Sequence, residues 1–88
     1  MRRYPASGEI NRRVDDQAAA MRRVLERYRS DALRVDETDG VGIDFERWRF
    51  NLRPSNTEPL IRLNVESRGD VPLMKEKTQE VLDLLGGA

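Results

Sequence analysis

Hydrophobic and polar residues alternate along residues 47–53 and again along residues 60–67. Side chains of a β-strand point to opposite faces in turn, so this alternation predicts two strands that are each buried on one face. The apolar positions of the two segments are Trp48, Phe50, Leu52, Ile61, Leu63 and Val65. Pro54 follows the first segment and cannot donate to a strand ladder, so we expect that strand to end there.

Three shorter segments also have strand character. Residues 7–14 place Ile10, Arg12 and Val14 on one parity, which predicts a short strand. Residues 32–35 and 41–45 flank an Asp39-Gly40 pair, a combination that favours a tight turn between antiparallel strands. We therefore expect a hairpin here, with the 32–35 strand the least clearly marked of the five.

Two segments repeat with helical spacing. The first segment, residues 15–30, begins with an aspartate cap, which is Asp15 or Asp16. The second segment, residues 68–85, has Asp70 as its cap and Pro72 in the first turn. The expected buried face of the first helix is Ala18, Met21, Leu25 and Tyr28, and that of the second is Met74, Thr78, Val81, Leu82 and Leu85. The arginines of the first helix, namely Arg22, Arg23, Arg27 and Arg29, are expected to form a solvated face.

These elements give the order β-α-β-β-β-β-α. Consecutive strands with short turns predict an α+β fold, in which an antiparallel sheet of four to five strands carries two helices on one face. The 88 residues suffice for one domain, expected to span residues 1–88.

Composition narrows the classes of function. The chain has no cysteine and no histidine, its net charge is zero, and a local excess of four positive charges lies in residues 1–30. The balance argues against a general polyanion binder. The N-terminus lacks the apolar run of a signal peptide, and no stretch approaches the about 20 apolar residues of a membrane span. We expect a cytoplasmic chain without a membrane partner.

The loop between the two alternating segments is the candidate binding site. The sequence RPSNTEPLIR, residues 53–62, places hydroxyl and amide donors between two arginines and two prolines. Arginine matches phosphate bidentately, and Arg62 could reach the same anion as Arg53 if the strands pair closely. Asn56 tolerates a left-handed conformation, which would aim backbone N–H groups at one point as an anion nest. Glu58 is expected to pair with an arginine and fix its rotamer.

Two other functions fit the same residues. In the first, residues 53–59 are only a polar hairpin loop in a structural domain, with proline and asparagine supplying the turn. In the second, RWRFNLR interleaves arginines with aromatic residues, as in sheets that stack nucleic-acid bases. Because Trp48 and Phe50 share the apolar parity with Leu52, we expect them in the core, and we expect no nucleic-acid partner.

No catalytic residues are expected in this chain. It has no Ser/His or Cys/His pair and no glycine-rich P-loop. Asp36, Glu37 and Asp39 are explained as turn and surface residues rather than as metal ligands.

The sequence RPSNTEPLIRLNVES closely resembles the C-terminal domain signature of the α-D-phosphohexomutases, the phosphomannomutase/phosphoglucomutase family. The resemblance extends over most of the chain, including the aromatic strand before the loop and the closing helix. It implies a TATA-binding-protein-like fold, in the fourth of four domains around a cleft. In that family, the fourth domain binds the substrate's phosphate and closes over it.

The resemblance also implies the reaction of the parent enzyme. It is an isomerase of carbohydrate metabolism, an intramolecular phosphotransferase that interconverts hexose 1-phosphate and hexose 6-phosphate through a hexose 1,6-bisphosphate. A phosphoserine loop, a Mg²⁺ site and a sugar-reading loop lie in the other three domains, which are the implied partners. This chain would bind neither the metal nor another cofactor.

Individual residues can be matched to the family signature. Arg53, Ser55, Asn56 and Thr57 match the phosphate-binding loop, and Arg62 matches the arginine of the following strand. Glu58 matches the glutamate of the signature, for which we infer an orienting role. Because the loops that carry the chemistry are missing, we expect the chain to be a domain of a longer enzyme and to be inactive alone.

Overall fold

The computed structural model describes residues 6–37 and 40–86, and its elements follow the predicted order. The strands are β1 (Ile10–Arg13), β2 (Arg34–Asp36), β3 (Val41–Asp44), β4 (Trp48–Pro54) and β5 (Leu60–Ser67). The helices are α1 (Gln17–Tyr28) and α2 (Val71–Leu85), and a short 3₁₀ helix, η1 (Arg29–Asp31), follows α1.

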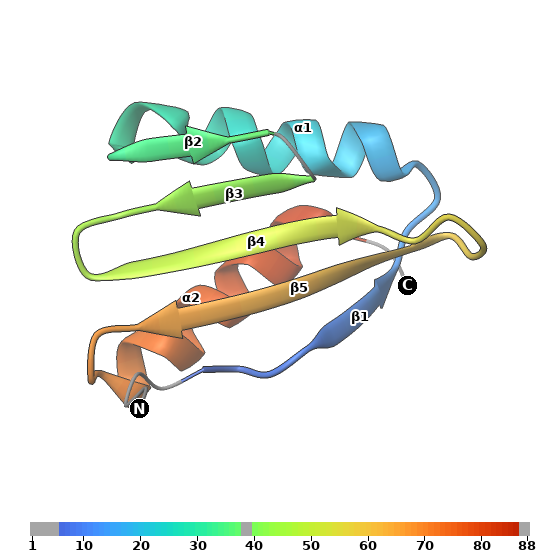
Figure 1. Cartoon of the computed structure of the whole chain (residues 1–88). Coiled ribbons are helices and arrows are strands. Elements are labelled where there is room, and N and C mark those ends of the chain that lie inside the picture. Colours follow the sequence, from blue (N-terminus) through green and yellow to red (C-terminus); the bar gives the residue numbers. More distant parts are fainter. Residues whose placement is uncertain (1–5, 38–39, 87–88) are drawn as a thin grey trace.

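The five strands form one antiparallel sheet in the order β1-β5-β4-β3-β2. Both helices lie against the same face of this sheet, and the other face is left open (Figure 1). This arrangement confirms the predicted α+β class and the expected sheet of four to five strands. The sheet is the platform that fixes where each end of the β4–β5 hairpin lies.

Alternation along β4 and β5 decides which side chains form the core. The six apolar positions predicted in these strands are all buried: Trp48, Phe50, Leu52, Ile61, Leu63 and Val65. Each fully buried side chain of this size contributes about 1.5–3 kcal/mol relative to an exposed one. Arginine and asparagine therefore occupy the open face of both strands, as the sequence predicts.

The outer strands differ in extent from the prediction. Pairing of β1 with β5 begins at Ile10, and before it an isolated bridge between Ala6 and Glu66 and hydrogen bonds between Ser7 and Val65 continue the contact. β2 starts at Arg34 rather than at residue 32, because the chain leaves η1 just before it and Leu33 stays 71% exposed. The polar residues at these edges favour short strands, which limits edge-to-edge pairing.

The turn between β2 and β3 can be checked at one of its two predicted residues. Asp39 lies outside the described residues, whereas Gly40 has φ +85°. A Cβ atom at Gly40 would lie 2.1 Å from the carbonyl oxygen of Leu52, so only glycine fits there. The glycine brings the start of β3 close to the backbone of β4.

The predicted buried face of α1 was partly wrong. Leu25 and Tyr28 are buried and Met21 is half-buried, but Ala18 is exposed while Ala20 and Val24 are buried. Three consecutive alanines leave the helical phase undetermined at the start of the helix. The contact with the sheet selects Ala20, because this alanine lies one turn before Val24 on the same face.

The helix termini are well capped. Asp16 and Asp70 accept hydrogen bonds from the backbone N–H groups of Ala19 and Leu73, which confirms aspartate caps for both helices. The predicted face of α2 is buried at Met74, Val81 and Leu85 and half-buried at Thr78 and Leu82.

The end of α2 is held by arginines from other elements. Arg23 donates to the carbonyl oxygens of Leu84 and Leu85, and Arg12 donates to that of Gly86. Carbonyl groups at a helix C-terminus have no partner within the helix, and cations there also favour the helix dipole. The arginine face of α1 is exposed as expected, but Arg23 also binds the second helix.

Among the described residues, no helix combines the length and the apolar character needed to cross a membrane.

Candidate functional site

The candidate site lies where β4 ends and β5 begins. The connecting segment, residues 55–59, is called the phosphate-loop candidate below. Figure 1 shows it projecting from one end of the β4–β5 hairpin, whereas α2 follows the other end of β5. A loop held between paired strands has its two flanking backbones at fixed positions, which suits a binding site.

Two arginines stand side by side at the base of this loop. Arg53 on β4 and Arg62 on β5 are direct cross-strand partners, and both are exposed on the open face. Like charges opposite each other on one face are destabilising, and an anion between them would relieve the repulsion. Glu9 lies near this pair, with its carboxylate 3.9 Å from Nε of Arg62. The structure therefore brings together the two arginines that are nine positions apart in the sequence.

Ser55 organises the loop from within. Its Oγ accepts the backbone N–H groups of Thr57 and Glu58 at 3.3 Å each, and it lies 3.5 Å from Oγ1 of Thr57. The backbone N–H of Ser55 donates to the carbonyl oxygen of Leu60 at 3.0 Å, closing the loop. A serine that accepts N–H groups two and three residues ahead forms a local turn. The two hydroxyl groups thus lie together at the loop.

A second element fixes the loop from outside. Gln17, the first residue of α1, donates from Nε2 to the carbonyl oxygens of Ser55, Glu58 and Leu60 at 2.9, 3.2 and 2.7 Å. The backbone N–H of Val14 donates to the carbonyl oxygen of Pro59 at 2.9 Å. Sequence analysis missed Gln17, because a glutamine in a first helical turn has no pattern that points to a loop about 40 residues away.

The expected left-handed conformation of Asn56 was wrong. No residue other than glycine has a positive φ within the described part of the chain. The hydroxyl of Ser55 organises the turn instead, so the backbone does not need a left-handed residue. Asn56 is exposed, and its side-chain amide makes no hydrogen bond to any of the described residues. Its donors face solvent.

The expected pair between Glu58 and an arginine is not formed among the described residues. Glu58 is exposed, and the carboxylate beside Arg62 belongs to Glu9. Glu58 contributes through its backbone, because its carbonyl oxygen accepts from Gln17 and from the N–H of Leu60. An orienting role for its side chain remains a prediction.

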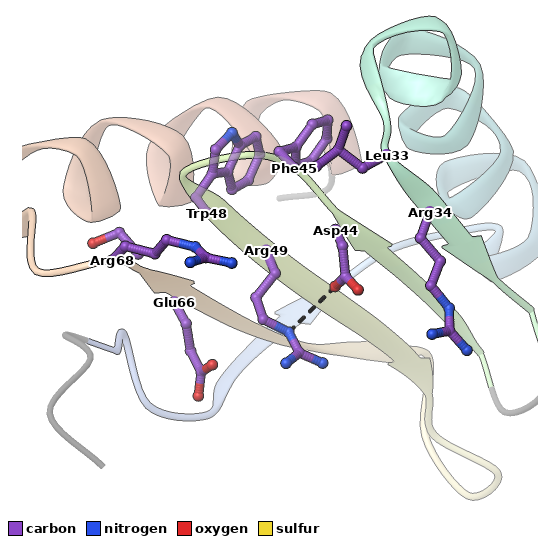
Figure 2. A pocket seen from close by; sticks show the side chains of 9 residues that line it. Leu33, Arg34, Asp44, Phe45, Trp48, Arg49, Glu66 and Arg68 are labelled. Atoms are coloured by element: carbon purple, nitrogen blue, oxygen red, sulfur yellow. Dashed lines mark ion pairs between the residues drawn. The ribbon is translucent and has the colours of Figure 1, made fainter.

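The pocket drawn in Figure 2 lies at the opposite end of the hairpin. Its volume is about 270 Å³, and Trp48 and Ser67 line it at the start of β4 and the end of β5. A row of alternating charges crosses the sheet here, with Glu66, Arg49, Asp44 and Arg34 as successive cross-strand partners. Arg49 and Asp44 form an ion pair at 3.4 Å. Arg49 therefore lies opposite an acidic residue on each neighbouring strand.

The aromatic residues of β4 are not available for base stacking on the arginine side. Trp48 is 8% exposed and Phe50 is 3% exposed, both beneath the helices. Tyr28 contacts both rings edge-on, with centroid distances of 5.5 and 5.6 Å. This placement agrees with the expectation that the rings belong to the core.

Among the titratable groups of residues 6–37 and 40–86, Tyr28 is the one whose pKa is strongly shifted. Burial raises the pKa of its phenol well above the ordinary value, and the hydrogen bond and charge of Glu80 raise it further. Tyr28 packs beside Phe45, Trp48 and Phe50 in the aromatic core, so this shift reports on stability rather than on binding. Within residues 6–37 and 40–86, no three His, Cys, Asp or Glu side chains are grouped so that they could hold a metal ion.

Comparison with known proteins assigns the family. The family described as "Phosphoglucomutase/phosphomannomutase, C-terminal domain" matches residues 9–84. The chain belongs to this family, as its signature predicted. The match includes the phosphate-loop candidate and both flanking strands.

Individual relatives agree with this assignment. A protein named phosphomannomutase from Salmonella montevideo is 58% identical over 85 residues, covering 97% of this chain and 19% of the relative. "Phosphohexose mutases" from Xanthomonas campestris pv. campestris (strain B100) is 55% identical, covering 99% of this chain and 19% of the relative. A phosphomannomutase from Methanocaldococcus jannaschii is 47% identical, covering 94% of this chain and 18% of the relative. The chain thus spans about a fifth of the length of these relatives.

Proposed function

We propose that this chain binds the phosphate group of a hexose phosphate, as the substrate-phosphate-binding domain of a phosphohexomutase. The residues that bind the phosphate are Arg53, Ser55, Asn56, Thr57 and Arg62, with Glu58 in an orienting role. The observation that carries the proposal is the direct pairing of Arg53 with Arg62 beneath a loop of hydroxyl and amide donors. Family membership supports the same assignment.

The chemistry of the loop suits a phosphate dianion. Two guanidinium groups supply charge and paired N–H donors, and the hydroxyls and the Asn56 amide supply further donors. Hydrogen bonds to a charged group contribute about 1.5–3 kcal/mol each, and association costs about 4 kcal/mol or more. Three or four such bonds therefore give an affinity of roughly millimolar for the domain alone. The rest of the substrate contacts would come from the other three domains of the parent enzyme.

The parent enzyme would interconvert hexose 1-phosphate and hexose 6-phosphate, with a hexose 1,6-bisphosphate as intermediate. Such an enzyme uses Mg²⁺, which the proposal assigns to another domain. This chain would bind and orient the substrate's phosphate. Because its phosphate-binding loop lies on a separate domain, that domain can close over the substrate and then open to release it for reorientation. The 88-residue chain alone is expected to show no mutase activity.

Two arginines on the same strand and face give a matched test. Arg53 lies at the loop end of β4 and Arg49 lies four residues earlier, where it pairs with Asp44. In a titration with mannose 1-phosphate, we expect Arg53→Met to weaken affinity about 10- to 100-fold, the loss of one or more charged hydrogen bonds. Arg49→Met should change it less than about twofold.

The alternatives are separated by the same titration. If Arg53→Met and Arg49→Met lost affinity equally, binding would depend on the overall positive charge of the sheet face. That result would contradict the assignment of the phosphate site to the loop. Neutral mannose should not bind measurably at the same concentration, because the proposed contacts are made to phosphate. Binding of mannose as tight as that of mannose 1-phosphate would also contradict the proposal.

A further inference from the structure

Gln17 contacts the loop in a way that its position in the sequence does not suggest. Its Nε2 group lies within hydrogen-bond distance of three carbonyl oxygens, those of residues 55 and 58 in the loop and of Leu60 at the start of β5. An amide nitrogen carries two N–H donors, so at least one of the contacts is shared. The side chain is half-buried between the start of α1 and the loop.

The direction of these contacts matters for anion binding. The carbonyl oxygens of residues 55, 58, 59 and 60 accept from Gln17 or from the N–H of Val14. Carbonyl oxygens are the negative ends of peptide dipoles, and these four, three in the loop and one at the start of β5, would repel an anion that approached from the same side. Gln17 and Val14 hold these oxygens on the α1 side of the loop, leaving the side-chain hydroxyls and the side-chain amide of Asn56 for a ligand.

Three backbone hydrogen bonds, accepted by the carbonyl oxygens of Glu58, Pro59 and Leu60, also hold the loop. It contains no left-handed residue, its residues 56–59 are exposed, and its internal bonds to Ser55 Oγ are 3.3 Å long. Pro54 and Pro59 restrict two φ angles but supply no donor. The shortest side-chain bond to the loop is the one from Gln17 to the carbonyl oxygen of Leu60, at 2.7 Å.

We propose that Gln17 is a positioning residue that holds the phosphate-loop candidate in its anion-binding conformation before a ligand arrives. This inference rests on the proposed function for its consequence in binding. The hydrogen bonds from Gln17 to the three carbonyl oxygens, called the Gln17 clamp below, can be observed without a ligand. α1 thereby has two roles, since its buried face packs in the core while its first residue sets the loop. Removing the Gln17 clamp lowers the fraction of loops that are ready to bind.

The test uses Gln17→Met in the 88-residue chain, because methionine has a similar length and no N–H donor. Gln79 on α2 serves as the matched control, since it is exposed and donates to Asp83 away from the loop. Hydrogen exchange of the Ser55 amide, which bonds to the Leu60 carbonyl, reports on loop opening. Affinity for inorganic phosphate reports on the ready fraction, which is the fraction of molecules whose loop is in the anion-binding conformation. The melting temperature reports on global stability.

For Gln17→Met we expect Ser55 to exchange about tenfold faster and the phosphate Kd to rise about tenfold, as when the ready fraction falls to a tenth. The melting temperature should stay within about 4 °C of that of the unaltered chain, because opening the loop leaves the packed core intact and a change of about 0.5 kcal/mol shifts the melting temperature of a small domain by about 2–4 °C. Gln79→Met should change none of the three. A purely structural role for Gln17 would instead lower the melting temperature and leave phosphate affinity at its original value.

Two results would overturn the inference. One is an unchanged Ser55 exchange rate and phosphate Kd in Gln17→Met. The other is a loop in the unaltered, ligand-free chain with amide order parameters below about 0.6, which would show that nothing holds it. If the unaltered chain fails to bind phosphate while Gln17→Met still loosens the loop, the proposed function fails and the Gln17 clamp stands.

Discussion

At one end of the β4–β5 hairpin, buried aromatic rings hold the structure by packing, whereas at the other end hydrogen bonds hold an exposed loop. Phe45 and Trp48 stack at 4.3 Å between centroids at the aromatic end, and Tyr28 packs against both. At the loop end, Gln17 and Ser55 provide the restraints. The same two strands therefore join a region held by core packing to the loop that we propose binds phosphate, and substitutions should separate stability from binding.

The largest expected effect is at the aromatic end. Phe50→Ala removes a ring that is 3% exposed, and we expect a loss of about 3–5 kcal/mol in the free energy of unfolding. Denaturant unfolding followed by tryptophan fluorescence measures this loss. Under conditions where the variant remains folded, its affinity for mannose 1-phosphate should be unchanged. A variant that loses affinity while keeping its stability would break the comparison.

The next effect is a dependence on pH at the aromatic end. Because burial raises the pKa of Tyr28, the unfolded chain loses the phenolic proton near its ordinary pKa of about 10 while the folded chain keeps it. This contribution to stability is complete below pH 10, and above it declines by up to about 1.4 kcal/mol per pH unit.

The matching control is Tyr28→Phe, which has no phenolic proton. We expect its free energy of unfolding to decline less steeply above pH 10 than that of the unaltered chain. Chemical denaturation at a series of pH values between 9 and 11 gives both slopes. Parallel slopes would show that Tyr28 does not titrate differently in the two states.

The cap of α2 tests the aromatic end without altering a ring. Asp70 accepts the N–H of Leu73 at 2.9 Å, and Asp70→Ala should cost about 1 kcal/mol of stability. Asp70→Asn keeps a cap and should cost much less. Thermal unfolding measures both, and neither variant should change phosphate affinity, since Asp70 follows the end of β5 that lies away from the loop.

The smallest effect on stability is expected at the loop end. Ser55→Ala removes the acceptor of two exposed N–H groups, which water can replace, so the free energy of unfolding should change by about 0.5 kcal/mol or less. The affinity for mannose 1-phosphate should fall about tenfold, because the variant loses a donor and the turn that organises its neighbours. A large loss of stability with unchanged affinity would reverse the assignment of the two ends.

Period-two patterns gave the most reliable part of the sequence-based prediction. Strand parity placed all six apolar residues that it assigned to the buried face of β4 and β5 correctly, since a shift of one residue in register would expose the whole set. The phase of α1 was harder to predict, because the alanines at its start carry little information on which side meets the sheet. Ala18 was assigned inward for that reason, and it is exposed.

The composition of the phosphate-loop candidate could be read from the sequence, but its conformation could not. Its donors and flanking arginines are local features, and a nine-residue separation across a hairpin suffices to anticipate that Arg53 and Arg62 meet. Gln17 could not be anticipated, because its contacts depend on how α1 packs on the finished sheet. The left-handed Asn56 was a reasonable expectation from propensity, but the Ser55 hydroxyl makes the turn in its place.

The central claim is that phosphate binds at the loop end of the hairpin, and an amide chemical-shift map with a hexose phosphate tests it most directly. We predict saturable shifts concentrated at residues 53–58 and at Arg62, with little change around Arg49 and Ser67 at the other end. Shifts centred on the pocket of Figure 2, or no shifts at residues 53–58 at ligand concentrations well above millimolar, would contradict the claim.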